Sequence, residues 1–81
     1  MFVVYVLYSK KFDNIYIGMT SNLEQRLLSH NTFGKKGWTM NYRPWEVIYQ
    51  ETQSEKSAAL KREKQLKSAT GRDFIWTLIR E

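Results

Sequence analysis

Cysteine is absent from the 81 residues, and histidine occurs once, at His30. Without cysteine the chain can form no disulfide and no thiolate zinc site, and it has no thiol nucleophile. The same absence favours a reducing compartment, so we expect the cytoplasm. A single histidine also argues against a metal site built from several imidazoles.

Long apolar segments are missing as well. No stretch approaches the roughly 18 apolar residues of a membrane-spanning helix, so no membrane partner is expected. The apolar start, residues 2–8, lacks a basic segment before it and a small-residue cleavage site after it. We therefore expect a strand there rather than a signal peptide.

Aromatic and basic side chains are what the sequence has in quantity. Aromatic residues make up 15% of the chain, and 13 Lys and Arg against 8 Asp and Glu give a net charge of +5. A chain of this length predicts one domain, residues 1–81, with a small core in which aromatic rings supply much of the buried area. The charge favours a polyanionic partner such as nucleic acid, although a well-solvated basic surface has the same composition.

The first half of the chain predicts a hairpin and a helix. Residues 2–8 and 15–19 have the composition of strands and are joined by a polar turn. If their register agrees, Tyr5 and Tyr16 lie on one face of this hairpin. Ser21 and Glu24 form a capping box that predicts a helix from there to about His30, with Asn31 as terminator.

The second half predicts one strand and two helices. Residues 45–51 alternate as a strand does, and a helix follows from a cap at Thr52 or Ser54. Thr70 is the expected cap of a last helix, with a buried face of four residues: Phe74, Ile75, Leu78 and Ile79. The order β-β-α-β-α-α predicts an α+β domain, a small, mostly antiparallel three-stranded sheet flanked by helices.

Glu63 is the residue that packing explains least. The inward side of its helix is defined by three apolar residues, Ala59, Leu60 and Leu66, and Glu63 lies one turn from each of them. An ionised carboxylate in such a stripe needs a cation, which is either a metal ion or an arginine. The candidate ion-pair partners are Arg26, Arg62 and Arg72.

A second group of polar side chains lies on the first helix. Arg26 and His30 are one turn apart, at the edge of the apolar stripe that Leu23 and Leu27 mark. Both residues suit a structural role as well as a catalytic one.

Five side chains together supply what a single-metal phosphodiesterase needs: Tyr5, Tyr16, Arg26, His30 and Glu63. The carboxylate would hold a divalent cation against the phosphate, and the arginine would stabilise the negative charge of the transition state. A tyrosine or the histidine would take a proton from the attacking water. A tyrosine base requires a pKa well below about 10, and an adjacent metal and arginine act in that direction.

Residues 31–44 form an aperiodic segment that is longer than most loops, which is a hint of function. Its basic side chains and those of the hairpin turn are the expected contacts to phosphates. These residues are Lys10, Lys11, Lys35, Lys36 and Arg43.

These residues resemble those of a GIY-YIG nuclease domain, of the short stand-alone bacterial kind. The resemblance covers nearly the whole chain and rests on Tyr5, the triplet Tyr16-Ile17-Gly18, the pair Arg26 and His30, Asn31, and the helix "LKREKQLK" with Glu63. Val3-Val4 stands where the family name has Gly-Ile. The larger nucleases carry an asparagine about a dozen residues after the glutamate, and "GRDFIWTLI" offers none, so turnover could be weak or lost.

The resemblance implies an endonuclease that hydrolyses phosphodiester bonds of nucleic acid, DNA in preference to RNA, with one Mg²⁺ or Mn²⁺ ion on Glu63. It implies that Tyr5 and Tyr16 line the site and that Arg26 and His30 handle charge and protons. Gly18 would keep the sheet surface open beside the phosphate, and Asn31 would be among the nucleic-acid contacts.

Two other functions fit the same residues. In the first, the tyrosines stack unpaired bases and the basic segment follows the backbone, with no hydrolysis. In the second, an aromatic patch of Trp38, Tyr42 and Trp45 binds another protein. Neither calls for an acid on a buried helical stripe, so Glu63 favours the nuclease. The oligomeric state is not predicted by any of these patterns.

Overall fold

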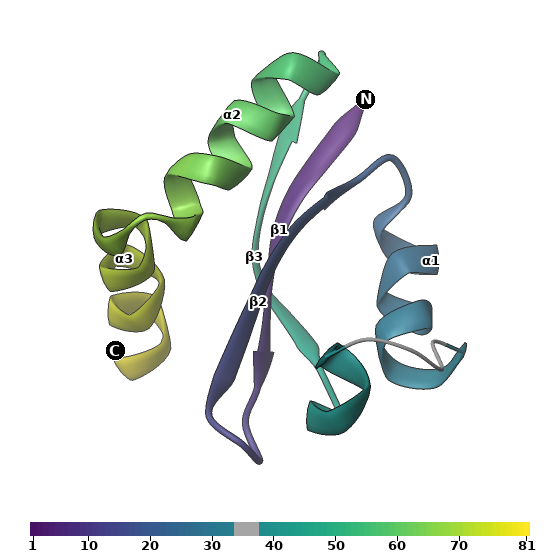
Figure 1. Cartoon of the computed structure of the whole chain (residues 1–81), viewed down its shortest axis with the longest axis vertical. Helices are drawn as coiled ribbons and strands as arrows, with labels where there is room; N and C mark the ends of the chain where they lie inside the picture. The colour runs from purple at the N-terminus through teal and green to yellow at the C-terminus, as the bar shows by residue number, and fades with distance from the viewer. Residues whose placement is uncertain (34–37) are drawn as a thin grey trace.

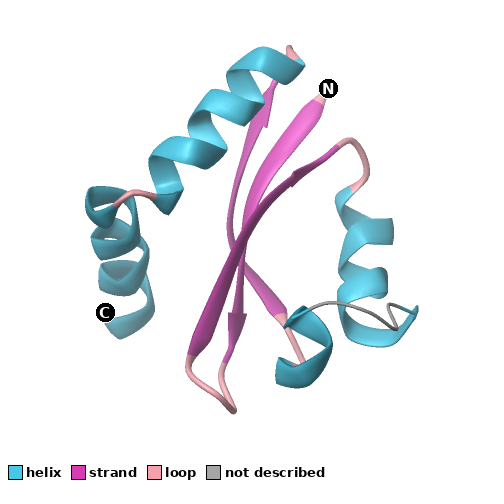
Figure 2. Ribbon diagram, viewed as in Figure 1, coloured by secondary structure: helices cyan, strands magenta, loops and turns pink. Residues whose placement is uncertain are grey.

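Three antiparallel strands form the centre of the molecule. The computed structural model describes residues 1–33 and 38–81. The sheet has the order β2-β1-β3, with β1 (Phe2–Ser9) between β2 (Asn14–Thr20) and β3 (Glu46–Gln53). Figure 2 shows the strands crossing the middle of the molecule with helices on both sides. The predicted α+β class and the order of its elements are confirmed.

The helices cover the two faces of the sheet unequally. Two long helices, α2 (Lys56–Lys67) and α3 (Ala69–Arg80), lie on one side (Figure 1). The other side holds α1 (Leu23–Leu28), a π-helical turn η1 (Ser29–Phe33) and a 3₁₀ turn η2 (Trp38–Tyr42). None of the helices in these ranges has the length and apolar character needed to cross a membrane.

Alternation along β1 divides the core into two clusters. One cluster lies under α2 and α3 and contains Val4, Val6, Ile15, Ile17, Ala59, Leu66 and Ile75. The other contains Tyr5, Leu7 and Trp45, with Leu23 and Leu27 of α1 packed against it. Because successive strand residues point to opposite faces, β1 is buried on both sides. In the β1–β2 register Tyr5 pairs with Gly18 and Leu7 with Tyr16, so the two tyrosines share a face as predicted.

The predicted helix caps are wrong at each helix. α1 is capped by Asn22 and not by Ser21, because Asn22 has the extended backbone and its side chain accepts a hydrogen bond from the Gln25 amide. α2 begins after Glu55, which makes no side-chain cap bond. Thr52 is instead part of β3, which runs to Gln53, two residues further than predicted.

The start and the packing face of α3 also differ from the prediction. Its cap is Ser68, whose hydroxyl accepts from the Gly71 amide at 3.2 Å, and Thr70 lies inside the first turn. Ile75 is fully buried, but Phe74 is 41% exposed and Leu78 is 38% exposed. The buried face is turned because Trp76 packs edge-on against Tyr8 of the sheet, with ring centroids 6.2 Å apart.

Candidate active site

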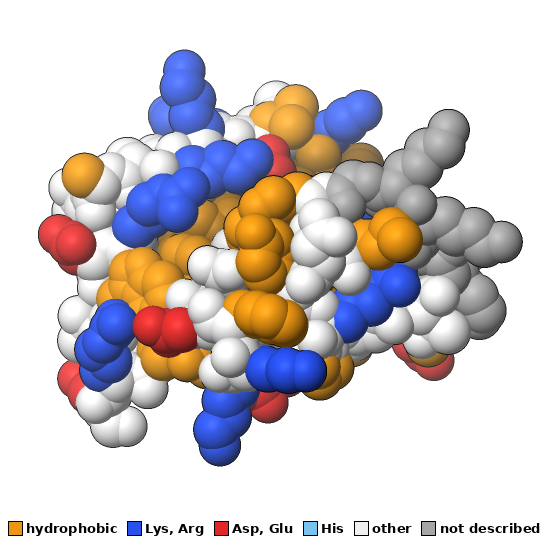
Figure 3. Space-filling model, turned by 60° about the horizontal axis from the view of Figure 1, so that its bottom comes forward, with side chains coloured by type: hydrophobic (Ala, Val, Ile, Leu, Met, Phe, Trp, Pro, Cys, Tyr) orange, Lys and Arg blue, Asp and Glu red, His pale blue; other side chains and the backbone are white. Residues whose placement is uncertain are grey.

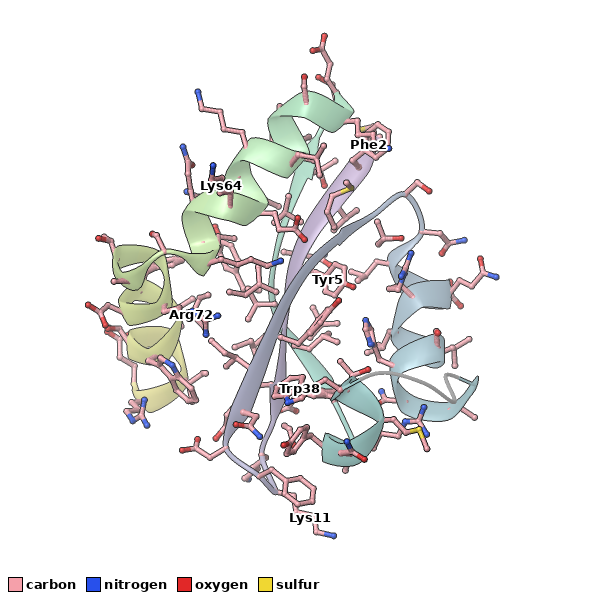
Figure 4. The ribbon with its side chains drawn as sticks, viewed as in Figure 1. Phe2, Tyr5, Lys11, Trp38, Lys64 and Arg72 are labelled. Atoms are coloured by element: carbon pink, nitrogen blue, oxygen red, sulfur yellow. The ribbon has the colours of Figure 1, made fainter. Side chains whose placement is uncertain are left out.

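Tyr5 and His30 meet inside the layer between the sheet and α1. The Tyr5 hydroxyl lies 3.1 Å from Nε2 of His30, and the Tyr5 side chain is 1% exposed. Tyr5 comes from the central strand and His30 from the π-helical turn, so two distant parts of the chain supply the pair. Figure 4 shows Tyr5 projecting from the sheet towards the α1 side. Both residues were predicted for the site, and the structure brings them together.

Gly18 leaves the space that the Tyr5 ring occupies. A Cβ atom at position 18 would lie 2.6 Å from the Tyr5 hydroxyl oxygen and 3.0 Å from Cε1 of Tyr16. Real Cβ atoms essentially never lie within 3.0 Å of another such heavy atom, so a side chain here would push Tyr5 from its position and crowd Tyr16. The glycine is therefore needed for room and not for an unusual backbone conformation.

His30 is held through both ring nitrogens. Its Nδ1 lies 3.0 Å from the hydroxyl oxygen of Thr39 in η2, while Nε2 faces Tyr5. Burial lowers the pKa of His30, and the charges of Arg26 and Arg43 lower it further. The imidazole is therefore neutral at pH 7, with one nitrogen donating and the other accepting. Thr39 was missed by sequence reasoning because it lies in an aperiodic segment with no pattern to mark it.

The segment after α1 is fixed by polar contacts to the backbone. Asn31 does not end the helix, which continues as η1, and its amide makes two hydrogen bonds to the backbone of Trp45, at 2.6 and 2.9 Å. Arg43 donates to the carbonyls of Ser29 and His30. Both side chains were predicted to contact nucleic acid, and the structure shows each of them supporting the turn that carries His30.

Tyr16 is the phenol that solvent can reach. It is half-buried, its ring centroid lies 4.7 Å from that of His30, and it lies 6.3 Å from the ring of Tyr5. The ring centroid of Trp45 lies 6.4 Å from that of Tyr16. Since Tyr5 is fully enclosed, Tyr16 is the tyrosine placed to touch a bound molecule.

Electrostatics at the Tyr5 hydroxyl link the remaining predicted residues. Burial raises the pKa of Tyr5, and the nearby Tyr16 and Glu63 raise it further, while the charge of Arg26 lowers it. The net effect keeps Tyr5 a neutral hydroxyl, which opposes the expectation that this tyrosine is a base. The Tyr5 hydroxyl of β1 is thus influenced by the other four predicted catalytic residues, which come from β2, α1, η1 and α2.

Glu63 has a cation beside it, but a different one from those expected. Its carboxylate lies 3.5 Å from Nζ of Lys67, one turn later in α2, and its side chain is 20% exposed. Arg62 instead pairs with Glu51, at 2.8 Å. The predicted apolar stripe is right at two of its three positions, because Ala59 and Leu66 are buried while Leu60 is 46% exposed.

The carboxylate of Glu63 suits a magnesium-type ion better than a closed metal cage. Within the described residues no three His, Cys, Asp or Glu side chains are grouped so as to hold a metal. Mg²⁺ commonly keeps several waters and binds through one or two carboxylates together with substrate phosphates. A single, partly exposed carboxylate whose charge acts on the Tyr5 hydroxyl is consistent with that mode of binding.

Glu51 has a structural role that the sequence did not reveal. It accepts hydrogen bonds from the Tyr49 hydroxyl, at 2.7 Å, and from Nε of Arg62, at 2.8 Å. Burial alone would raise the pKa of Glu51, but these two donors hold the pKa below its usual value. The network joins β3 to α2. Alternation in β3 places Tyr49 and Glu51 on one face and was the available signal.

The predicted basic side chains lie in separate places. Arg26 lines a polar hollow together with Thr20, Ser21, Asn22, Gln25 and Ser29. Lys10 and Lys11 are exposed at the hairpin turn, as expected. Lys35 and Lys36 lie outside the described residues.

Comparisons with known proteins agree with this arrangement. A family model described as the GIY-YIG catalytic domain matches residues 1–77. A UPF0213 protein of Staphylococcus haemolyticus is 40% identical over 65 residues, which cover 79% of this chain and 79% of the relative. A UPF0213 protein of Natronomonas pharaonis is 37% identical over 65 residues, which cover 80% of this chain and 75% of the relative. The solution NMR structure of a UPF0213 protein from Bacillus halodurans has the same fold, with a TM-score of 0.56 and 22% identity over 96% of this chain and 85% of that one.

Proposed function

Because the chain belongs to the GIY-YIG catalytic-domain family, we propose that it is a divalent-metal-dependent endonuclease that hydrolyses phosphodiester bonds of DNA, or of RNA. The observation that carries the proposal is the convergence on Tyr5. Its hydroxyl is bonded to His30 and is acted on at once by Tyr16, Arg26 and Glu63. The five side chains that bear on this hydroxyl come from five elements, which the packing of a small α+β domain does not require.

Each residue has a distinct task in this proposal. The exposed guanidinium of Arg26 binds the phosphate and stabilises the negative charge of the transition state. Tyr16, the accessible phenol, accepts the proton of the attacking water. Tyr5 and Thr39 are positioning residues that fix the ring and the tautomer of His30.

Glu63 is the residue that would hold Mg²⁺ or Mn²⁺. Such an ion supplies positive charge to the phosphate oxygens and the leaving oxygen, and it lowers the pKa of nearby acids. Nζ of Lys67 lies 3.5 Å from the Glu63 carboxylate, so this ammonium group would compete with the ion for it. This arrangement limits metal affinity in the absence of a bound phosphate.

Cleavage of a supercoiled plasmid and of labelled oligonucleotides, with and without Mg²⁺ or Mn²⁺, tests the proposal. The parent should cut only with metal, and Glu63→Gln and Tyr16→Phe should each lose at least about a hundredfold in rate. Glu55→Gln is the matched control, since it removes an exposed carboxylate next to the same helix and should cut like the parent. Equal cleavage by all four proteins would contradict the assignment of these residues.

A nucleic-acid-binding module without hydrolysis is the second candidate. The specific observation in its favour is the Lys67–Glu63 ion pair, which supplies a cation where the nuclease needs a metal. In that case the parent binds oligonucleotides but gives no products at any metal concentration. Lys67→Met separates the two functions, because freeing the carboxylate should strengthen metal binding only if Glu63 is a metal ligand.

A further inference from the structure

A row of aromatic side chains leads from the candidate active site to the hairpin turn. Tyr16 contacts Trp45, whose ring lies 5.8 Å from that of Trp38. Trp38 lies 4.5 Å from Tyr42, which in turn meets Phe12 at 5.4 Å. Figure 4 shows the labelled Trp38 between Tyr5 and Lys11, in agreement with this chain of contacts.

The outer end of this row faces solvent. Trp38 is 47% exposed and Phe12 is 43% exposed, whereas Trp45 behind them is buried. The rings of Trp38, Tyr42 and Phe12 meet at interplanar angles of 46° and 82°, so none of them is stacked face to face on its neighbour. Figure 3 turns this end of the molecule towards the viewer and shows hydrophobic side chains gathered there with basic ones beside them. We call Phe12, Trp38 and Tyr42 the aromatic platform.

The platform is fixed relative to the site through η2. The indole Nε1 of Trp45 donates to the carbonyl of Thr39 at 2.8 Å, and the hydroxyl of the same Thr39 contacts His30. This short turn therefore holds the imidazole of His30 through Thr39 and also carries Trp38 and Tyr42. A molecule on the platform has a set position relative to Tyr16.

The charges next to the platform identify its ligand. Nζ of Lys11 lies 5.5 Å from the centre of the Phe12 ring, and Lys10 and Lys11 line a hollow that Trp45 and Glu46 share. Sites for single-stranded nucleic acid combine a positively charged track with aromatic rings on which bases stack. Protein-binding surfaces are instead poor in lysine. The second expectation for these aromatic residues, a contact with another protein, is therefore the weaker one.

We propose that the aromatic platform stacks unpaired bases, so that the substrate is a nucleic acid with a single-stranded segment beside the scissile phosphate. This inference rests on the proposed nuclease function for the phosphate, but the stacking itself needs no hydrolysis. The bases lie on Phe12 and Trp38 while Lys10 and Lys11 meet the backbone. A blunt duplex has no free base faces and gains only the contacts to its phosphates.

The test measures binding by fluorescence anisotropy, in EDTA, of a labelled 12-nucleotide single strand and of the blunt duplex of the same sequence. The parent should favour the single strand, and Phe12→Leu and Trp38→Leu should each weaken that binding by about five- to a hundredfold. Their duplex affinity should change less than about twofold. Phe74→Leu is the matched control, because Phe74 is 41% exposed and lies on α3, across the sheet.

Unchanged single-strand affinity in both variants would contradict a role of the aromatic platform in base stacking. A protein partner would then be the remaining ligand for this surface. Equal losses for single strand and duplex would overturn stacking as well. Urea denaturation of each variant shows that the fold is intact, and Phe12 in the turn provides a second substitution if Trp38→Leu is unstable. Because EDTA prevents cleavage, a failed platform and a failed nuclease give different results: the first changes binding here, and the second changes only the plasmid assay.

Discussion

The Tyr5 hydroxyl lies 3.1 Å from Nε2 of His30, although 25 positions separate the two residues in the chain. Both side chains are buried, so this contact links the central strand to the turn after α1 without help from solvent. Loss of this contact should therefore lower the stability of the fold as well as the activity of the site.

Tyr5→Phe should lower the free energy of unfolding by about 1–3 kcal/mol, because it leaves a buried imidazole nitrogen without a partner. Urea denaturation measures the change. Tyr8→Phe is the control: it removes the exposed hydrogen bond from Tyr8 to Asp13 and should cost less than about 1 kcal/mol. Equal costs for the two variants would mean that the Tyr5–His30 contact does not hold the layer together.

His30 should make stability depend on pH. Its pKa is below the 6.5 of an unperturbed imidazole because of burial and of Arg26 and Arg43, and the rings of Tyr5 and Tyr16 enclose it. Neutral His30 therefore contributes stability that is fully present above about pH 6.5 and is lost as the pH falls through the lower, folded pKa. The melting temperature of the parent should drop more between pH 7.5 and pH 5.5 than that of His30→Gln. Parallel curves would show that protonation of His30 does not oppose folding.

Glu63→Gln and Glu51→Gln should separate a functional carboxylate from a structural one. The ion pair of Glu63 with Lys67 is half-exposed, and its loss should change the free energy of unfolding by at most about 1 kcal/mol. Glu51→Gln leaves Tyr49 and Arg62 with a weaker acceptor and should cost about 1–3 kcal/mol. In thermal melts, added Mn²⁺ should raise the melting temperature of the parent and of Glu51→Gln but not that of Glu63→Gln. A loss of several kcal/mol in Glu63→Gln would identify Glu63 as a structural residue.

Gly18→Ala should displace Tyr5, because the added methyl carbon would lie 2.6 Å from its hydroxyl oxygen. We expect a loss of about 1–3 kcal/mol, typical of overpacking. A double-mutant cycle with Tyr5→Leu checks the cause, since the shorter side chain makes room and Gly18→Ala should then cost less. An undiminished cost in the Tyr5→Leu background would place the clash elsewhere, with Tyr16 as the other close neighbour.

Sequence patterns predicted the features that depend on a regular spacing of side chains. Alternation located the strands and put Tyr5 and Tyr16 on one face, because pleating forces that arrangement. The helix caps were less predictable: Ser21 and Asn22 are both good caps, and the choice between them depends on where β2 stops. The partner of Glu63 also escaped prediction: it is Lys67, one turn later on the same helix, whereas Arg62 pairs with Glu51 of β3.

The residues of the site were predictable from the sequence, but the role of each residue was not. Nothing in the sequence shows that Tyr5 is enclosed and Tyr16 accessible, because both follow the same alternation. Thr39 and the aromatic platform depend on how an aperiodic segment folds back onto β1, which is a matter of tertiary contacts. Asn31 and Arg43 looked like surface contacts for the same reason, and their partners are backbone atoms far along the chain.

The π-helical turn η1 makes this part of the chain sensitive to its length. A π-turn closes a wider ring than an α-turn and so contains one residue more. Deleting one residue between Ser29 and Phe33 would let α1 continue regularly, but it would rotate the following side chains by about 100° about the helix axis. Deletion of Ser29 would thus turn His30 away from Tyr5 and Asn31 away from Trp45. Insertions and deletions in this segment would therefore disable the site even when every predicted catalytic residue is retained.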